Sequence, residues 1–135
     1  MSLFLRVGVA GESYALPVSE VLEVADYAGV ARVPGAAAAV LGVRNLRGAV
    51  LPVVDLATVL GLPRSGAPAR LVVAEAGGRT AGLAVDSVTG VEVLPEATEP
   101  VESAHLSGAA LADGALVGML NLGSVFDAAQ GEAAA

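Results

Sequence analysis

The sequence predicts a mostly β protein made of two similar lobes that share one core. Short apolar runs of valine, leucine and alanine recur along the chain, glycines and prolines separate them, and the second half repeats the first. Such runs, rich in β-branched residues and bounded by turn residues, are typical of strands. Aromatic residues make up only 3% of the chain, so small aliphatic side chains must fill the core. The 135 residues, 1–135, are enough for a single domain or for two closely fused small lobes.

The repeat consists of two pairs of segments with nearly equal spacing. ALPVSEVLEV, which begins at Ala15, resembles GLAVDSVTGV, which begins at Gly82. GAVLPVVDLATVL, which begins at Gly48, resembles GALVGMLNLGSVF, which begins at Gly114. A composition dominated by a few small residue types can also produce matches by chance, but two matches at almost the same spacing favour a duplicated lobe.

The chain is expected to open with a β-hairpin. Residues 4–9 and 14–18 are predicted as strands that flank the turn residue Gly11. Residues 19–27 fit either a short helix capped by Ser19 or a strand.

A turn and an alanine-rich segment come next. Val33-Pro34-Gly35 has the composition of a turn. Residues 36–41 are predicted as one or two helical turns, because alanine has the highest helix propensity.

Residues 42–60 organise the rest of the chain. Gly48 indicates a tight turn with positive φ, and residues 49–54 are predicted as a strand buried on both faces. Pro52 cannot donate a hydrogen bond within the sheet, so it should lie at a bulge or an edge. Asp55 is predicted to cap a short helix by accepting hydrogen bonds from its first N–H groups, and Gly61 to end it.

Residues 63–68, PRSGAP, have the composition of a surface linker. We expect the two lobes on either side of it, at about 3–62 and 69–127. The second lobe should repeat the hairpin, with strands at 71–76 and 81–85 around a Gly-Gly turn.

The charges are distributed unevenly. The net charge is −7, which disfavours nonspecific binding to nucleic acid. All seven basic residues are arginine, and Arg32, Arg44 and Arg47 lie between residues 27 and 54, where there is no acid. This segment indicates an oriented surface for a protein partner, unless its arginines serve only to keep an apolar stretch soluble.

The residues needed for catalysis are scarce. The chain has no cysteine and no lysine, and its one histidine, His105, lies in a small-residue context typical of a structural role. Asp55 and Asp86 each follow an apolar run; they could form a carboxylate pair, but cap and turn roles are favoured. Glu92, Glu96, Glu99 and Glu102 are expected to form a solvated acidic surface. We expect no catalytic residues, no metal and no cofactor, because the known nucleotide, metal and nucleophile motifs are absent.

No uncharged apolar stretch reaches the length of a membrane span, and the first residues lack the features of a signal peptide. The expected location is cytoplasmic, without direct insertion into a membrane.

The chain resembles the CheW family, the coupling proteins of bacterial and archaeal chemosensory arrays. The resemblance rests on the Val33-Pro34-Gly35 turn, on GVRNLRG from Gly42 and VLPVVDL from Val50, and on GLAVDSVTGV from Gly82. It covers about residues 4–126. It implies two SH3-like, five-stranded β-barrel lobes with short helices. It also implies a non-enzymatic adaptor that links methyl-accepting chemoreceptors to the regulatory domain of a CheA-type histidine kinase, in the cytoplasm beside membrane receptor arrays.

The same resemblance implies a set of protein-binding positions. Arg47 matches the arginine and Asn45 the asparagine of the family's N-x-R-G motif, and Gly42 lies shortly before that motif. The other positions implied in receptor or kinase contact are Val21, Glu23, Gly82, Val88 and Val91. Arg44 stands where the family more often has an apolar or small residue.

Two alternative functions stay open at this point. One is an adaptor of the same fold in a chemosensory-like pathway that controls twitching or development rather than flagella. The other is a small-molecule-binding or hydrolytic β-barrel that uses His105 and a carboxylate.

Overall fold

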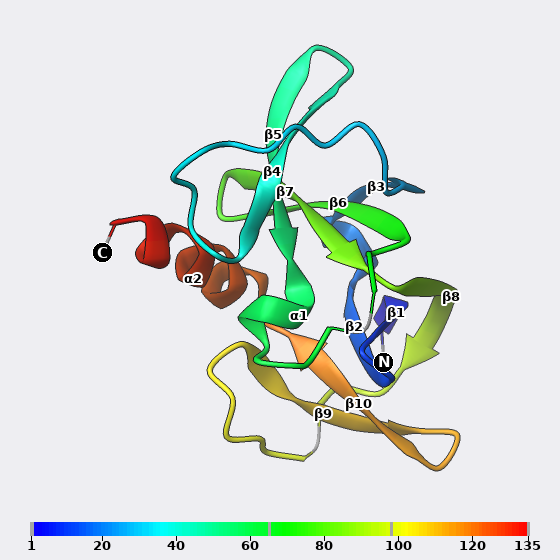
Figure 1. Cartoon of the computed structure of the whole chain (residues 1–135). Coiled ribbons are helices and arrows are strands. Elements are labelled where there is room, and N and C mark those ends of the chain that lie inside the picture. The colour runs from blue at the N-terminus through cyan, green and yellow to red at the C-terminus, as the bar shows by residue number, and fades with distance from the viewer. Residues whose placement is uncertain (1, 65, 98, 135) are drawn as a thin grey trace.

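Two five-stranded sheets make up most of the molecule, and a helix lies at its C-terminal end (Figure 1). The structure is a computed structural model that describes residues 2–64, 66–97 and 99–134. Its elements in chain order are β1 (Ser2–Val9), β2 (Glu12–Pro17), the 3-10 turn η1 (Val18–Glu20), β3 (Val21–Asp26), β4 (Val40–Leu46), β5 (Ala49–Asp55), α1 (Leu56–Val59), β6 (Arg70–Ala76), β7 (Arg79–Val85), β8 (Ser87–Leu94), β9 (Leu106–Ala112), β10 (Ala115–Leu120) and α2 (Leu122–Ala134). The predicted mostly β class is confirmed.

The two sheets have the same internal order. The first runs β8-β1-β2-β10-β9 and the second β3-β6-β7-β5-β4. In both, one hairpin is central, a parallel pair joins it to a second hairpin, and the fifth strand flanks the other side: β2 pairs with β10 and β7 with β5. The equivalent strands are those that the two similar spacings match, so the repeat in the sequence is a repeat in the topology.

Each sheet contains strands from both halves of the chain. β3 follows β2 in sequence but pairs with β6, whereas β8 follows β7 but pairs with β1. The two halves therefore exchange one strand each. The linker between the halves follows α1 and leads to β6, so the strands before and after it, β5 and β6, both belong to the second sheet. This exchange ties the two sheets together, since neither could keep its fifth strand if they separated.

In each sheet one isolated β-bridge joins the two edges, but the strands do not form a closed barrel. After β3, Ala31 exchanges two backbone hydrogen bonds with Val43 of β4, each 2.8 Å long. In the first sheet Glu99 and Ala109 make the equivalent exchange. The lobes are thus SH3-like, as the resemblance implied, but each is an open sheet joined at its edges by one isolated bridge.

The core is divided into one shared cluster and two smaller ones. The shared cluster joins Leu5 and Leu16 of the first sheet, Val72 and Leu83 of the second, and Phe126 of α2. A smaller cluster fills each sheet separately. The expected shared core is present, and valine, leucine and alanine form nearly all of it.

Residues 19–27 combine both of the predicted alternatives. η1 covers the first positions and β3 begins at Val21. The prediction of helical turns at 36–41 was wrong: two consecutive turns, closed by hydrogen bonds from Ala36 to Val33 and from Val40 to Ala37, lead directly into β4. A few alanines cannot offset the cost of nucleating a helix, and pairing with β5 gives Val40 more partners.

The central strand β5 is buried only in its second half. Val53 and Val54 are buried, as predicted, whereas Ala49, Val50 and Pro52 are exposed. β5 pairs with β7 only from Val53 onward, so its first half projects with β4 as a free hairpin. Pro52 lies just before that parallel pairing, at an edge position as expected.

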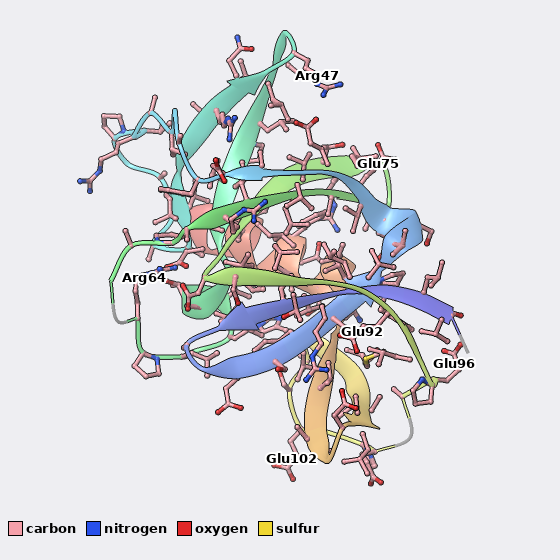
Figure 2. All side chains as sticks on the ribbon, turned by 90° about the vertical axis from the view of Figure 1, so that its right-hand side faces the viewer. Arg47, Arg64, Glu75, Glu92, Glu96 and Glu102 are labelled. Carbon is pink, nitrogen blue, oxygen red and sulfur yellow. The ribbon has the colours of Figure 1, made fainter. Side chains whose placement is uncertain are left out.

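Asp55 lies at the N-cap position of α1, but its carboxylate does not bond the backbone of the helix. Instead it accepts hydrogen bonds from the hydroxyl of Thr58, 2.7 Å away, and from the guanidinium of Arg64. Asp55 is only 3% exposed and is the buried charged residue of the described chain. Arg64, which the linker prediction placed at the surface, turns inward to neutralise it and also approaches Asp86 at 3.9 Å (Figure 2).

The equivalent cap in the second repeat does bond the helix backbone. The side chain of Asn121 accepts a hydrogen bond from the N–H of Ser124 at 3.1 Å. The helix that follows, α2, is 13 residues long and packs into the shared core, so it is longer than the short helices expected. Gly118 leaves room for Tyr14, whose ring would lie 2.8 Å from an added Cβ.

Candidate protein-binding site

The hairpin β4–β5 ends in a tight turn that presents Arg47. Arg47 and Gly48 both have positive φ, 53° and 85°, which is the backbone of a type I′ turn. The side chain of Asn45 accepts a hydrogen bond from the N–H of Gly48 at 3.2 Å and fixes the turn. The Arg47 side chain is 80% exposed, and Figure 2 shows it at the tip of the hairpin.

Glu23 holds one side of the Arg47 guanidinium. The Nε atom of Arg47 lies 3.3 Å from Oε1 of Glu23, whose side chain is 26% exposed. Glu23 belongs to β3 and Arg47 to the hairpin that starts with β4, so the ion pair joins elements at opposite edges of the second sheet. Within the described residues the two terminal nitrogens of Arg47 bond nothing else, which leaves them free for a carboxylate or carbonyl of a partner.

Arg44, a second arginine of the acid-free segment, also forms a hydrogen bond with β3. Nη1 of Arg44 donates to the backbone carbonyl of Asp26 at 2.9 Å. The acid-free segment therefore lies beside acidic residues that precede it in sequence, Glu23 and Asp26. Charge counting along the chain missed this compensation, because it depends on the pairing of distant strands.

Two of the predicted binding residues are glycines in tightly packed places. A Cβ on Gly42 would lie 2.8 Å from the carbonyl carbon of Ala31 and closer still to its oxygen, and one on Gly82 would lie 2.9 Å from Leu71. Both glycines permit close packing inside the second sheet. Their structural role is this packing, and neither has a side chain that could contact a partner.

The valines occupy two different environments. Val21 and Val88, at equivalent positions of the repeat, are partly buried against the shared core. Val91 on β8 is 56% exposed. The structure thus groups Glu23, Asn45 and Arg47 at one hairpin and puts Val88 and Val91 on a strand of the other sheet.

Sequence reasoning missed an apolar strip beside Val91. Val93 is 57% exposed, and its cross-strand partner Leu3 on β1 is 52% exposed. Glu92, between the two valines, turns toward Arg6 at 3.5 Å. An alternating pattern normally predicts valines inside and glutamate outside, so only the paired strand reveals that these valines face solvent. An exposed apolar strip is a candidate interaction surface.

The four glutamates between residues 92 and 102, of which Glu92 lies on β8 and the others follow it, are dispersed. Figure 2 shows Glu92, Glu96 and Glu102 well apart from one another in the lower half of the molecule. Glu96 accepts a hydrogen bond from Ser2 at 3.2 Å, while Glu99 and Glu102 are exposed.

His105, the one histidine of the chain, forms hydrogen bonds with structural neighbours. Nδ1 of His105 lies 2.8 Å from the hydroxyl of Ser124, and the carbonyl of His105 accepts the N–H of Asn121 at the start of α2. Across the described ranges, no three histidines or carboxylates gather as a metal site would require.

Burial raises the pKa of Glu20 in η1 above its ordinary value. No helix within those ranges has the length and apolar character needed to cross a membrane.

Comparisons with known proteins agree with this geometry. The family model of the CheW-like domain matches residues 3–130. "Chemotaxis protein CheW" of Rhizobium meliloti is 31% identical over 93% of this chain and 88% of that protein. "Protein PilI" of Pseudomonas aeruginosa is 35% identical over 71% of this chain and 58% of that protein. The crystal structure of the scaffolding protein TtCheW from Thermoanaerobacter tengcongensis superposes with a TM-score of 0.85 at 27% identity, covering 93% and 92% of the two chains.

Proposed function

Because this chain belongs to the family of CheW-like domains, we propose that it is an adaptor without enzymatic activity that couples methyl-accepting chemoreceptors to a CheA-type histidine kinase. The names of its relatives, a chemotaxis protein and a scaffolding protein, support this assignment. The regulatory domain of the kinase is the partner that we propose for the hairpin surface.

One observation carries the proposal: Arg47 lies exposed on a two-residue turn, and Glu23 contacts only its Nε atom. A guanidinium oriented in this way can bind a partner's carboxylate or carbonyls through its two terminal nitrogens with little loss of side-chain freedom. We assign Glu23, Asn45 and Arg47 to direct binding or to orientation of the bound partner.

The remaining residues have two further roles in this proposal. Gly42 and Gly82 keep the second sheet closely packed behind the hairpin. We assign Val21 and Val88, partly buried against the core, and the exposed Val91 to apolar contacts with a partner. Interfaces typically combine an apolar centre with a polar rim, and the two groups would supply one of each.

The proposed lack of catalysis rests on the surroundings of the reactive groups. His105 is bonded to Ser124 and to the cap of α2, with no carboxylate joined to it in the described chain. Arg64 forms an ion pair with the buried Asp55 and lies 3.9 Å from Asp86, so its positive charge offsets one of the two carboxylates and holds Asp55 in a structural contact. We therefore set the hydrolytic alternative aside and propose a cytoplasmic protein that operates beside membrane-bound receptors.

An adaptor in a pathway other than flagellar chemotaxis remains the second candidate. The similarity to Protein PilI favours it, because that relative matches 71% of the chain yet has a different name from the others. Both candidates require the same two kinds of partner and differ only in the output of the kinase.

Direct titration tests the function. The purified chain is titrated calorimetrically with the regulatory domain of a CheA-type kinase and with a receptor cytoplasmic fragment, both encoded in the same genome. We expect each to bind, and all three to co-elute in size-exclusion chromatography. Absence of binding to every such kinase and receptor of that genome contradicts the proposal.

A further inference from the structure

Arg32 differs from the other six arginines. Each of those reaches an acidic side chain or a backbone carbonyl of the chain. Arg32, in the segment between β3 and β4, makes no hydrogen bond or ion pair with any residue that the structure describes, and it is exposed. A planar guanidinium without a partner, in a chain whose other guanidinium groups are all used, points to an external ligand.

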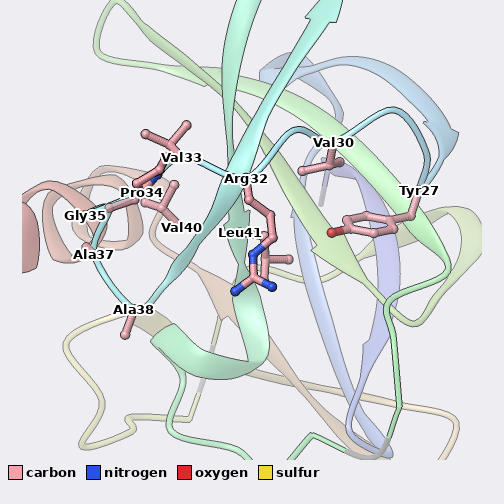
Figure 3. A pocket seen from close by; sticks show the side chains of 11 residues that line it. Tyr27, Val30, Arg32, Val33, Pro34, Gly35, Ala37, Ala38, Val40 and Leu41 are labelled. Atoms are coloured by element: carbon pink, nitrogen blue, oxygen red, sulfur yellow. The ribbon is translucent and has the colours of Figure 1, made fainter.

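Arg32 lines a cavity of about 640 Å³. The cavity is open to solvent on one side and is lined by the turns between β3 and β4 and by the first residues of β4, including Tyr27, Val30, Val33 and Leu41. Figure 3 shows the Arg32 side chain in the middle of these lining residues, and the hydroxyl of Tyr27 points toward it. Its volume lies within the range of about 300–1,000 Å³ that is usual for ligand sites.

The lining carries a positive charge that nothing in the cavity offsets. No acidic residue lines it, and residues 27–54 contain none. Tyr27 offers a hydroxyl donor, and the valines and Leu41 offer apolar wall. This combination of one cation, one hydroxyl and apolar side chains matches a carboxylate flanked by apolar groups.

We propose that this cavity is a docking site for an acidic side chain in an extended segment of a partner protein, with the carboxylate on Arg32 and Tyr27 and the neighbouring apolar side chains against Val33 and Leu41. Charge complementarity argues for this occupant. A polyanion such as nucleic acid would need several aligned cations, whereas this lining holds one, on a chain of net charge −7.

The docking site is separate from the hairpin surface. The cavity uses Val40 and Leu41 at the start of β4, and Arg47 follows the last residue of that strand. The inference does not depend on the proposed adaptor function, since it rests on Arg32 and its surroundings alone.

Nuclear magnetic resonance with a defined probe tests the site. The probe is a blocked pentapeptide, acetyl-Ala-Leu-Glu-Leu-Ala-amide, titrated into the ¹⁵N-labelled full chain up to about 10 mM, with its Leu-Gln-Leu counterpart as the uncharged comparison. We expect saturable shifts at the amides of Tyr27 and Leu41 and at Nε of Arg32. The Gln peptide should bind about tenfold more weakly, because it loses a charge-assisted hydrogen bond.

Variants assign the effect to the cavity. Arg32→Gln should weaken binding of the Glu peptide about tenfold without unfolding the protein, since Arg32 makes no bond within the described chain. Tyr27→Phe should weaken it by a smaller factor, and Arg47→Gln, from the same acid-free segment, should leave it unchanged. Equal binding of the two peptides, unaltered binding to Arg32→Gln, or shifts confined to other surfaces overturns the proposal. So does succinate reproducing the same shifts at equal concentration, because the site would then accept a small carboxylate without a peptide.

Discussion

Gly42 and Gly108 occupy the same position in the two sheets, separated by the spacing of the repeat. Each precedes the residue that forms the isolated bridge closing its sheet: Gly42 precedes Val43, and Gly108 precedes Ala109. Their φ angles are 154° and 152°, and each packs against the backbone of the segment that crosses over it. The single bridge that joins the edges of each sheet therefore depends on a missing side chain at one repeated position.

Substitution of Gly42 should destabilise the protein strongly. A Cβ there would overlap the backbone carbonyl of Ala31, which cannot move as a flexible side chain can. We expect Gly42→Ala to lower the free energy of unfolding by about 2–4 kcal/mol, from strain and overpacking together. Urea denaturation measures this loss.

Two other glycines serve as controls for that prediction. A Cβ at Gly108 would lie 2.8 Å from Cβ of Ala97 and 3.1 Å from the backbone oxygen of Glu99, a less severe overlap than at Gly42, so Gly108→Ala should cost less. Gly90→Ala has a φ of 143° but open space, so it isolates the backbone strain. The expected order of destabilisation is Gly42, then Gly108, then Gly90. Equal losses at all three would mean that the crossing segment does not constrain Gly42.

The Asp55–Arg64 pair should contribute more to stability than a helix cap does. Loss of a cap costs about 0.5–2 kcal/mol, whereas removing one member of a buried ion pair costs about 3–5 kcal/mol. Arg64 is one-quarter exposed, so we expect Asp55→Ala to lower the free energy of unfolding by about 2–4 kcal/mol. The double variant Asp55→Ala/Arg64→Ala should show a coupling of about 1–3 kcal/mol in a mutant cycle. Additive losses would contradict a direct interaction.

Arg47 variants should separate binding from folding. Its ion pair with Glu23 is largely exposed, so Arg47→Glu should change the free energy of unfolding by no more than about 1 kcal/mol. Arg47→Asn should be neutral or slightly stabilising, because asparagine tolerates the positive φ of a type I′ turn. Both should weaken calorimetric binding of the kinase or receptor by about 1–3 kcal/mol.

The control for Arg47 is Arg70→Glu. It changes the charge equally but at the start of β6, where Arg70 pairs with the largely exposed Asp26. We expect it to bind both partners like the wild type. If Arg47→Asn retains full affinity, or if Arg47→Glu unfolds the protein, the binding role of Arg47 is wrong.

Alkaline unfolding should depend on Tyr14. Burial, aided by the nearby charge of Glu12, raises the pKa of Tyr14 above 10.0. Since the folded state holds the proton more tightly than the unfolded state, this contribution to stability is complete below about pH 10 and is lost as pH rises through the folded pKa. The melting temperature should therefore fall above about pH 10 in the wild type and fall less in Tyr14→Phe. The chain has no lysine, which keeps the comparison simple.

Local features of the sequence were predictable because their causes lie within a few residues. The turn at Gly48, the short helix after Asp55 and the hairpin of β6 and β7 follow from turn chemistry and short-range periodicity. The repeat was also visible in the sequence, since equivalent strands and caps need similar residues. The site residues, by contrast, came from the family resemblance, and their direct contacts with a partner remain predictions.

Other features depended on contacts between distant segments. Residues 36–41 form turns instead of a helix because Val40 pairs with Val54. Arg64, which the composition of the linker predicted to be exposed, instead forms an ion pair with a buried carboxylate. The order of charges along the chain could not predict that Glu23 lies beside Arg47. Their contact forms because β3 and the β4–β5 hairpin, at opposite edges of the second sheet, approach each other in the folded protein.

By itself the sequence determined the strands, their turns and the duplication, because periodicity and glycine placement act along the chain. Only the tertiary structure decided that β3 and β8 exchange sheets. Either assignment satisfies the same local pattern of apolar residues. The choice is made by the shared cluster, in which side chains of both sheets and of α2 are buried together, and that burial exists only once the whole chain has assembled.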